Sequence, residues 1–171
     1  MNADDLRALQ APLKDKYKID PEAAVITLKA KGELDGAGVV CKIDTGRALV
    51  EAGLHPATGG PGTHACSGDM LLEALAACAG VTLKAVAAAL AFNLKGGSVN
   101  VEGDLDFRGT LGVDRSAPVG FREIRVTFDL DTDEPQDRID ALTKLTERYC
   151  VVFQTIVKPP ATRLTVTKTA G

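Results

Sequence analysis

The run SGDMLLEALAACAGVTLKAVAAAL constrains the fold of this chain more than any other feature of its sequence. It consists almost wholly of Ala, Leu and Val, with a few polar interruptions. Ser67 is a good N-cap, and Asp69 in the first turn suits the positive end of a helix dipole. The glycine pair at 96–97 is a natural stop. We therefore predict one long helix over residues 68–92.

Apolar side chains cover two neighbouring stripes of this helix. A helix of that kind must be covered on both sides, by sheets or by a second copy of itself. The small residues Ala76, Ala79 and Gly80 would let another helix approach closely. The apolar run is broken by Glu73, Gly80, Thr82 and Lys84. We therefore expect a buried central helix and no membrane span.

The segments around this helix alternate apolar and polar residues, as half-buried strands do. Strands are predicted at residues 23–34, 33–44, 98–109, 121–133 and 162–170, with a hairpin turn at Asp35-Gly36 and a short extra strand at 47–50. A second helix is predicted over residues 134–150. This order contains no regular βαβ alternation, so the fold class is α+β. Residues 1–20 form a helical arm and residues 21–171 the domain.

Composition and charge limit the classes of binding partner and the cellular compartment that we expect for this protein. The net charge is −3 and the pI is near 5.4, which argues against nucleic acid or an anionic membrane as a partner. The N-terminus is polar and contains Pro12, unlike a secretory signal, and four cysteines without such a signal suggest a reducing compartment. We therefore expect a cytoplasmic protein.

The cysteines and histidines do not form a metal-binding pattern. There is no C-x-x-C pair, and the cysteines are widely spaced. His55, His64 and Cys66 lie in or beside one loop and could join a metal, but solvated loop residues are the more common case. We expect no metal and no cofactor.

Two cysteines stand out as candidates for thiol chemistry. Cys78 lies in the middle of the apolar helix, where burial raises a thiol pKa unless a cation or a backbone dipole offsets it. From composition alone such a cysteine is most often inert core. Cys150 lies at a junction between a helix and an apolar segment. If a new helix begins there, its N–H groups, with nearby Arg148, would stabilise a thiolate.

The motif SGDMLLEALAACAGVTL resembles the central-helix signature of the OsmC/Ohr family, and the later LTERYC is similar to that family's second cysteine site. The order of elements matches from about residue 23 to 169. By this resemblance Cys78 corresponds to the peroxide-attacking cysteine and Cys150 to the resolving cysteine. Cys66 and Cys41 match nothing catalytic.

The resemblance implies a thiol-dependent peroxidase that reduces organic hydroperoxides through a sulfenic acid and a disulfide. A dithiol or lipoyl-type reductant would reopen the disulfide. It also implies antiparallel sheets packed around the central helix and an intertwined homodimer with its sites at the subunit interface.

The residue that activates Cys78 departs from the family pattern. The usual glycine turn with its arginine is replaced by KAKGELDGAG, which carries only lysines. Arg47 resembles the arginine that some members carry before the central loop, so it is the substitute that we predict. The family's acid corresponds to Gly68 or Asp69. At about 100° per residue, Asp69 lies on the opposite side of a regular helix from Cys78, so it is equally well explained as a helix-dipole acid.

The sequence is also compatible with two other functions. One is a non-peroxidase of the same fold that binds a small apolar ligand and keeps both cysteines as thiols. The other is a structural or stress-related interaction protein. The missing arginine of the glycine turn favours these alternatives, whereas the two cysteines favour the enzyme.

Overall fold

The structure, a computed structural model, describes residues 3–33, 42–43, 52–63 and 65–166. Its helices and strands are α1 (Ala3–Ile19), β1 (Val25–Glu33), β2 (Lys42–Ile43), β3 (Ala52–Gly53), β4 (Ala65–Cys66), α2 (Ser67–Ala89), β5 (Gly96–Asp106), α3 (Phe107–Thr110), β6 (Phe121–Asp131), α4 (Gln136–Tyr149) and α5 (Val151–Val157). Two short 3-10 helices, η1 (Pro21–Ala24) and η2 (Pro56–Thr58), complete them.

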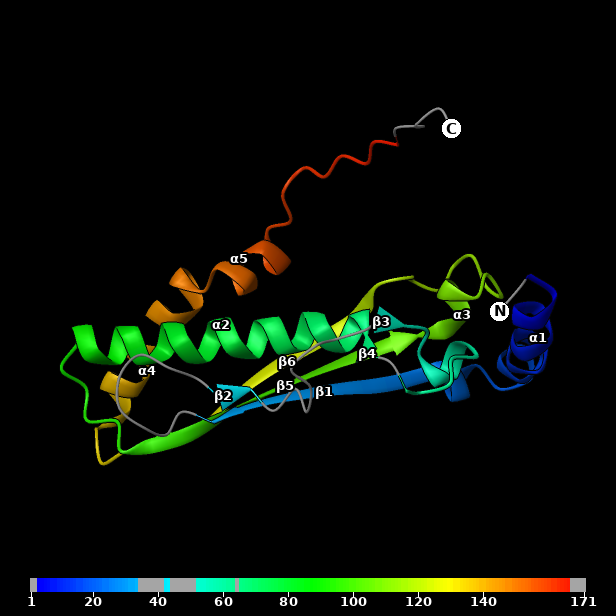
Figure 1. Cartoon of the computed structure of the whole chain (residues 1–171). Coiled ribbons are helices and arrows are strands. Elements are labelled where there is room, and N and C mark those ends of the chain that lie inside the picture. Colours follow the sequence, from blue (N-terminus) through cyan, green and yellow to red (C-terminus); the bar gives the residue numbers. More distant parts are fainter. Residues whose placement is uncertain (1–2, 34–41, 44–51, 64, 167–171) are drawn as a thin grey trace.

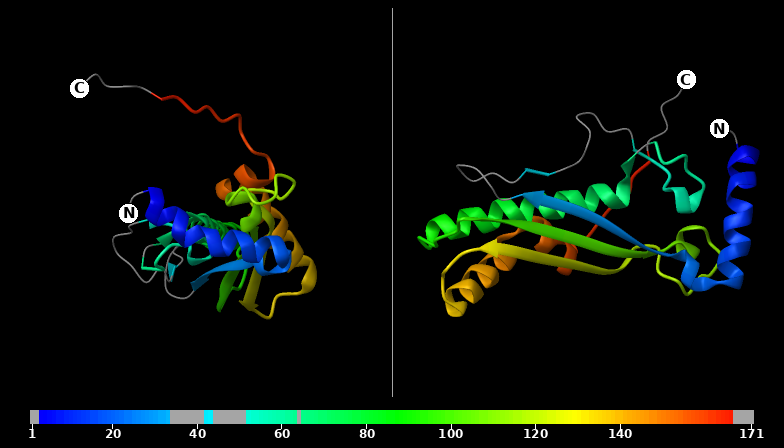
Figure 2. Two further views of the ribbon diagram at one scale, coloured as in Figure 1. Left: turned by 90° about the vertical axis from the view of Figure 1, so that its right-hand side faces the viewer. Right: turned by 90° about the horizontal axis from the view of Figure 1, so that it is seen from below.

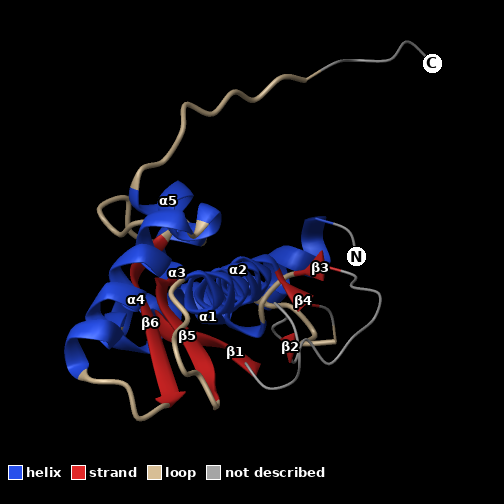
Figure 3. Ribbon diagram, turned by 90° about the vertical axis from the view of Figure 1, so that its left-hand side faces the viewer, coloured by secondary structure: helices blue, strands red, loops and turns tan. Residues whose placement is uncertain are grey.

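One antiparallel sheet and one long helix form the body of the molecule. The sheet has the strand order β2-β1-β5-β6, and α2 lies along one of its faces (Figure 1). Seen along α2 in Figure 3, the sheet lies beneath the helix, and α4 and α5 lie to one side. The predicted α+β class is confirmed. The second sheet that the structure describes differs from the expectation, because β3 and β4 are a short parallel pair.

The core forms where α2 meets the sheet and α4. Alternation along β5 turns Val99 and Val101 toward α2, and both side chains are fully buried. α2 contributes Leu72, Leu75 and Leu83 to the same core. Burial of aliphatic side chains stabilises the fold by about 25 cal/mol per Å² of apolar surface. This packing explains how a chain without tryptophan builds a core.

The long helix was predicted closely, but both of its ends differ. Cys66, and not Ser67, is the N-cap, and its side chain makes no capping hydrogen bond. The helix ends at Ala89, earlier than expected, because Ala91 adopts a left-handed φ of 46° and Phe92 turns back into the core. The Phe92 N–H then donates to the Ala87 carbonyl, which closes the C-terminus.

By length and hydropathy α2 could cross a membrane, and no other helix in the described ranges could. Half of its apolar window is buried inside this protein, as for a core helix. The side of α2 that carries Met70 and Val81 stays partly open, with these two residues 38% and 39% exposed. The predicted cover on both sides of α2 is therefore incomplete in a single chain.

The predicted last strand, 162–170, is not a strand over its described part. Residues 159–166 have no regular structure and extend away from the body (Figures 1 and 2). Leu164 and Val166 are 91% and 85% exposed. The segment has the alternating pattern of a strand, but a strand also needs a partner, and this segment pairs with no strand in the described chain.

The N-terminal arm is a helix, as predicted, and it is tied to the body. Tyr17 is 2% exposed, and its hydroxyl donates to the Ala57 carbonyl at 2.9 Å. α1 packs at the end of the molecule that holds η2 and α3 (Figure 2). Several other predictions lie outside the described residues: the turn at Asp35-Gly36, the strand at 47–50, Cys41, Arg47 and His64.

Candidate active site

The structure brings Cys78 and Cys150 together from two different elements. Cys78 lies near the middle of α2, and Cys150 lies at the junction of α4 and α5, where it is 1% exposed. The apolar side of α4 positions this junction, since fully buried Leu142 anchors the helix against α2. Buried Ala79 is small, so the junction can lie close to α2.

Four hydrogen-bond donors converge on the Cys78 sulfur. Two are the backbone N–H groups of Val151 and Val152, which begin α5. The others are the thiol of Cys150 and the hydroxyl of Thr82, one turn further along α2. All four stabilise the thiolate more than the thiol.

The two thiols acquire different acidities. Burial raises the pKa of Cys78, but the hydrogen bonds from Val152, Cys150, Thr82 and Val151 outweigh it, so its pKa falls below the ordinary thiol value. Burial also dominates at Cys150 and, with the hydrogen bond to Cys78 and the charge there, raises its pKa to about 11. The hydrogen bond from the Phe153 N–H offsets this only in part. Cys78 is therefore the thiol of the pair that ionises more readily.

A helix does begin after Cys150, one case considered from the sequence, but the cysteine whose pKa falls is Cys78 and not Cys150. α5 begins at Val151 with Cys150 as its N-cap. Its first N–H groups help lower the pKa of Cys78, while the pKa of Cys150 stays high. Thr82 was not predicted as a site residue. Its spacing of four from Cys78, which puts both on one helix face, was the available signal.

Of the two activating residues predicted for Cys78, Asp69 is not among the groups that shift its pKa, and the other cannot be placed. Arg47 lies outside the described residues, so its role stays a prediction. Asp69 lies beside His55 at the start of α2: burial raises the pKa of its carboxyl, and the charge of His55 opposes that rise. None of the described groups that shift the pKa of Cys78 is a cation.

A cavity of about 200 Å³ opens beside Cys150, between α2, β6, α4 and α5. Its walls are mainly apolar, from Val126, Phe128 and Phe153, and Glu147 lies at its edge. Cys150 is part of its wall, so a small molecule in this cavity would lie against that cysteine. Over the described part of the chain, no three His, Cys, Asp or Glu side chains are grouped to hold a metal ion.

Comparison with known proteins agrees with this geometry. The family model for OsmC-like protein matches residues 60–165. A crystal structure of an OsmC-like hydroperoxide resistance protein from Jannaschia sp. CCS1 has the same fold, with a TM-score of 0.58 over 85% of this chain and 97% of that chain, at 16% sequence identity. No curated protein is matched by the sequence.

The antiparallel sheet, the long core helix and the thiol pair above it define a dithiol α+β protein of the OsmC-like fold. The family match spans more than half of the chain and contains both cysteines. The chain therefore belongs to the OsmC-like protein family, as its central-helix motif predicted.

Proposed function

We propose that this protein is a thiol-dependent peroxidase that reduces organic hydroperoxides with the Cys78–Cys150 pair. The observation that carries the proposal is the hydrogen-bonded contact between the two thiols, one with a lowered and one with a raised pKa. A two-cysteine peroxidase needs this combination, a thiolate to attack and a neighbouring thiol to resolve.

The reaction follows from the two acidities. The Cys78 thiolate attacks the terminal oxygen of a hydroperoxide, the O–O bond breaks, and the alkoxide leaves as an alcohol after taking a proton. The oxygen stays on Cys78 as a sulfenic acid. The Cys150 sulfur then attacks the Cys78 sulfur, a disulfide forms, and the oxygen leaves as water. Overall the hydroperoxide gains two electrons and the dithiol loses two.

The substrate class and the reductant are part of the proposal. The surroundings of the thiol pair are apolar, which favours an organic hydroperoxide over hydrogen peroxide. The disulfide must be reopened by an external dithiol, and a lipoyl-type dithiol is the class that the family resemblance suggests. A supply of reduced thiols agrees with the cytoplasmic location expected from the sequence.

We also propose that the protein works as a homodimer. The open side of α2 and the projecting segment 159–166 both present apolar side chains that a single chain leaves exposed. A second copy would cover both. Light scattering tests this, with Leu164→Asp expected to weaken the dimer and Thr165→Asp, at the next position in the alternation, expected to leave it intact. A monomer at micromolar concentration in the unmodified protein would refute the dimer.

A ligand-binding protein of the same fold is the second candidate. It is favoured by the finding that none of the described groups acting on Cys78 is a cation. In that case both cysteines would remain thiols during function.

Steady-state consumption of cumene hydroperoxide with dihydrolipoamide separates the two candidates. Cys78→Ser should abolish turnover, Cys150→Ser should stop it after one equivalent, and Cys66→Ser should leave it unchanged. Peptide mapping after one equivalent of peroxide should find the Cys78–Cys150 disulfide. Turnover that does not depend on Cys78, or no turnover at all, would leave the ligand-binding candidate ahead.

A further inference from the structure

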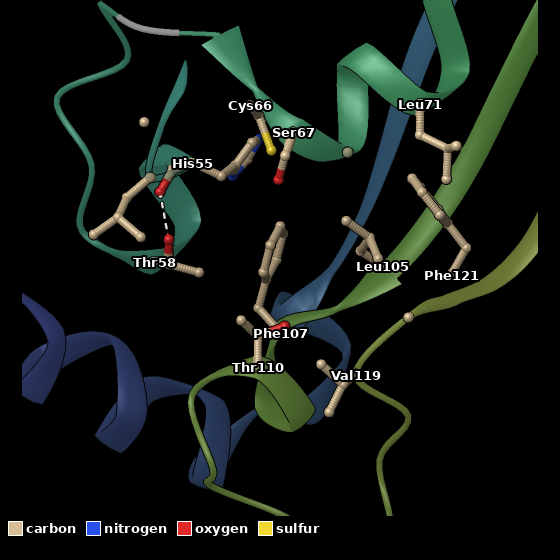
Figure 4. A pocket seen from close by; sticks show the side chains of 14 residues that line it. His55, Thr58, Cys66, Ser67, Leu71, Leu105, Phe107, Thr110, Val119 and Phe121 are labelled. Atoms are coloured by element: carbon tan, nitrogen blue, oxygen red, sulfur yellow. Dashed lines mark hydrogen bonds between the residues drawn. The ribbon is translucent and has the colours of Figure 1, made fainter. Parts of the chain in front are cut away.

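A second and larger cavity lies at the opposite end of the molecule from α4, around the start of α2 (Figure 4). Its volume is about 400 Å³, within the range of small-molecule sites. It is enclosed by β3, η2, the first turn of α2, the end of β5, α3 and the start of β6. Its lining includes neither Cys78 nor Cys150, the two residues on which the proposed peroxidase chemistry rests.

The cavity has a polar end and an apolar end. His55, Cys66 and Ser67 gather on one side, where α2 begins (Figure 4). Phe107 stacks on His55, and beyond it the lining is apolar and comprises Leu71, Leu105, Val119 and Phe121. Such a lining suits a ligand with an apolar body and a single polar group.

The hydrogen bonds of His55 decide what that polar group must be. Its Nδ1 accepts the Ala57 N–H at 3.0 Å, so in the neutral ring the hydrogen is on Nε2. Burial lowers the pKa of His55 and the nearby Asp69 charge opposes this, so the ring is neutral near pH 7. The ring is also held by stacking on Phe107, with centroids 4.9 Å apart and planes 18° apart.

This tautomer argues against a Cys66–His55 nucleophile pair. A histidine activates a thiol by accepting its proton, and here Nδ1 is occupied by a backbone donor while Nε2 already carries hydrogen. Nε2 can only donate, and among the described hydrogen bonds none uses it. The polar end of the cavity therefore presents a fixed donor.

We propose that this cavity is a binding site for a small molecule with an aromatic or branched apolar body and one acceptor oxygen, which the Nε2–H of His55 holds. The body packs against Phe107, Leu105 and Phe121. Cys66 and Ser67 border the acceptor. This site is separate within one chain from the thiol pair, because the twelve residues from Cys66 to Cys78 span about 18 Å along a helix.

Two matched probes test the ligand chemistry. 2-Acetylnaphthalene has a carbonyl acceptor, and 2-ethylnaphthalene has nearly the same shape without it. Equilibrium dialysis against the full chain should show the acetyl probe binding about fivefold tighter, as expected for one hydrogen bond. Equal affinities for the two probes, or no binding of either, would overturn the proposal.

Three variants test the location. His55→Phe keeps a ring against Phe107 but removes the donor, so it should weaken the acetyl probe about fivefold and leave the ethyl probe unchanged. Val119 is 67% exposed on the cavity wall, so Val119→Trp should fill the cavity without unfolding the chain and reduce both affinities at least tenfold. Val157→Trp, at a half-exposed valine outside the cavity, is the control and should change neither.

The Cys78→Ser variant separates the test of this binding site from the test of the proposed peroxidase activity. It should bind both probes like the unmodified protein even if it has lost all turnover. Loss of binding in Cys78→Ser or unchanged binding in Val119→Trp would show that the cavity is not the site. An equal loss of both probes in His55→Phe would overturn the assignment of His55 as the donor.

Discussion

The thiol of Cys150 donates a hydrogen bond to the sulfur of Cys78, and this contact helps move their pKa values apart. For Cys78 the bond is one of four that together outweigh burial and lower the pKa. For Cys150 it adds to burial, and the pKa rises to about 11. The two thiols thus differ in acidity because of their hydrogen bonds and burial, without a described cation.

The first prediction concerns Thr82, whose hydroxyl donates to Cys78. Thr82→Val removes this donor while keeping the shape of the side chain, so the pKa of Cys78 should rise. Alkylation of Cys78 by iodoacetamide at pH 7 should slow about tenfold, the size expected for a hydrogen bond to a charged group. Thr127→Val, at an exposed threonine of β6 outside the cavity beside Cys150, is the control. Unchanged alkylation in Thr82→Val would remove Thr82 from the site.

The second prediction concerns Arg47, which lies outside the described residues. If its guanidinium approaches the thiolate, Arg47→Ala should raise the pKa of Cys78 and cut the peroxidase rate at least tenfold while the fold is retained. Circular dichroism checks the fold, and alkylation of Cys78 across pH gives the pKa. Arg115→Ala is the matched control. Alkylation that does not change in Arg47→Ala would leave activation to the hydrogen-bond donors of α2 and α5.

The third prediction concerns Asp104 at the centre of the sheet. Its carboxylate accepts hydrogen bonds from Arg125 and Thr27 across three strands, and they lower its pKa to about 2. A carboxyl whose pKa is lower in the folded state stabilises the fold above its unfolded pKa of about 4 and loses that contribution as the pH falls through about 2.

Asp104→Asn should therefore flatten the fall in unfolding free energy between pH 4 and pH 2, measured by urea unfolding at a series of pH values. Asp129→Asn is the control, because Asp129 bonds across strands to the uncharged Asn100. Identical pH profiles for Asp104→Asn and the unmodified protein would show that this ion pair adds nothing to acid stability.

The fourth prediction uses two neighbouring glycines at the start of β5. Gly97 has a φ of 147°, and a Cβ there would lie 2.3 Å from the Asp129 carbonyl oxygen. A Cβ at Gly96 would meet nothing within 4 Å. Gly97→Ala should lower the unfolding free energy by about 2 kcal/mol or more, and Gly96→Ala should change it by less than about 0.5 kcal/mol. Thermal unfolding measures both, and equal effects would contradict the register of β5 and β6.

Much of the fold could be predicted because local sequence patterns encode it. The Ala- and Leu-rich run predicts α2, and strict alternation predicts β1, β5 and β6 within a few residues. The helix after Cys150 was considered from the sequence only as one case and was not among the predicted elements. The prediction of a strand over 162–170 is wrong in its described part, because alternation shows only that a segment could pair and not that a strand pairs with it.

The amino-acid sequence by itself determined the α+β class, the central helix and the two cysteines as candidates. Only the tertiary structure decided which thiol has the lower pKa, because that depends on which N–H groups and hydroxyls reach each sulfur. The tertiary structure alone also decided that the carboxyl of Asp69 lies beside His55. Helix and strand periods are local, whereas the acidity of a buried group depends on donors and burial contributed by residues far apart in the chain.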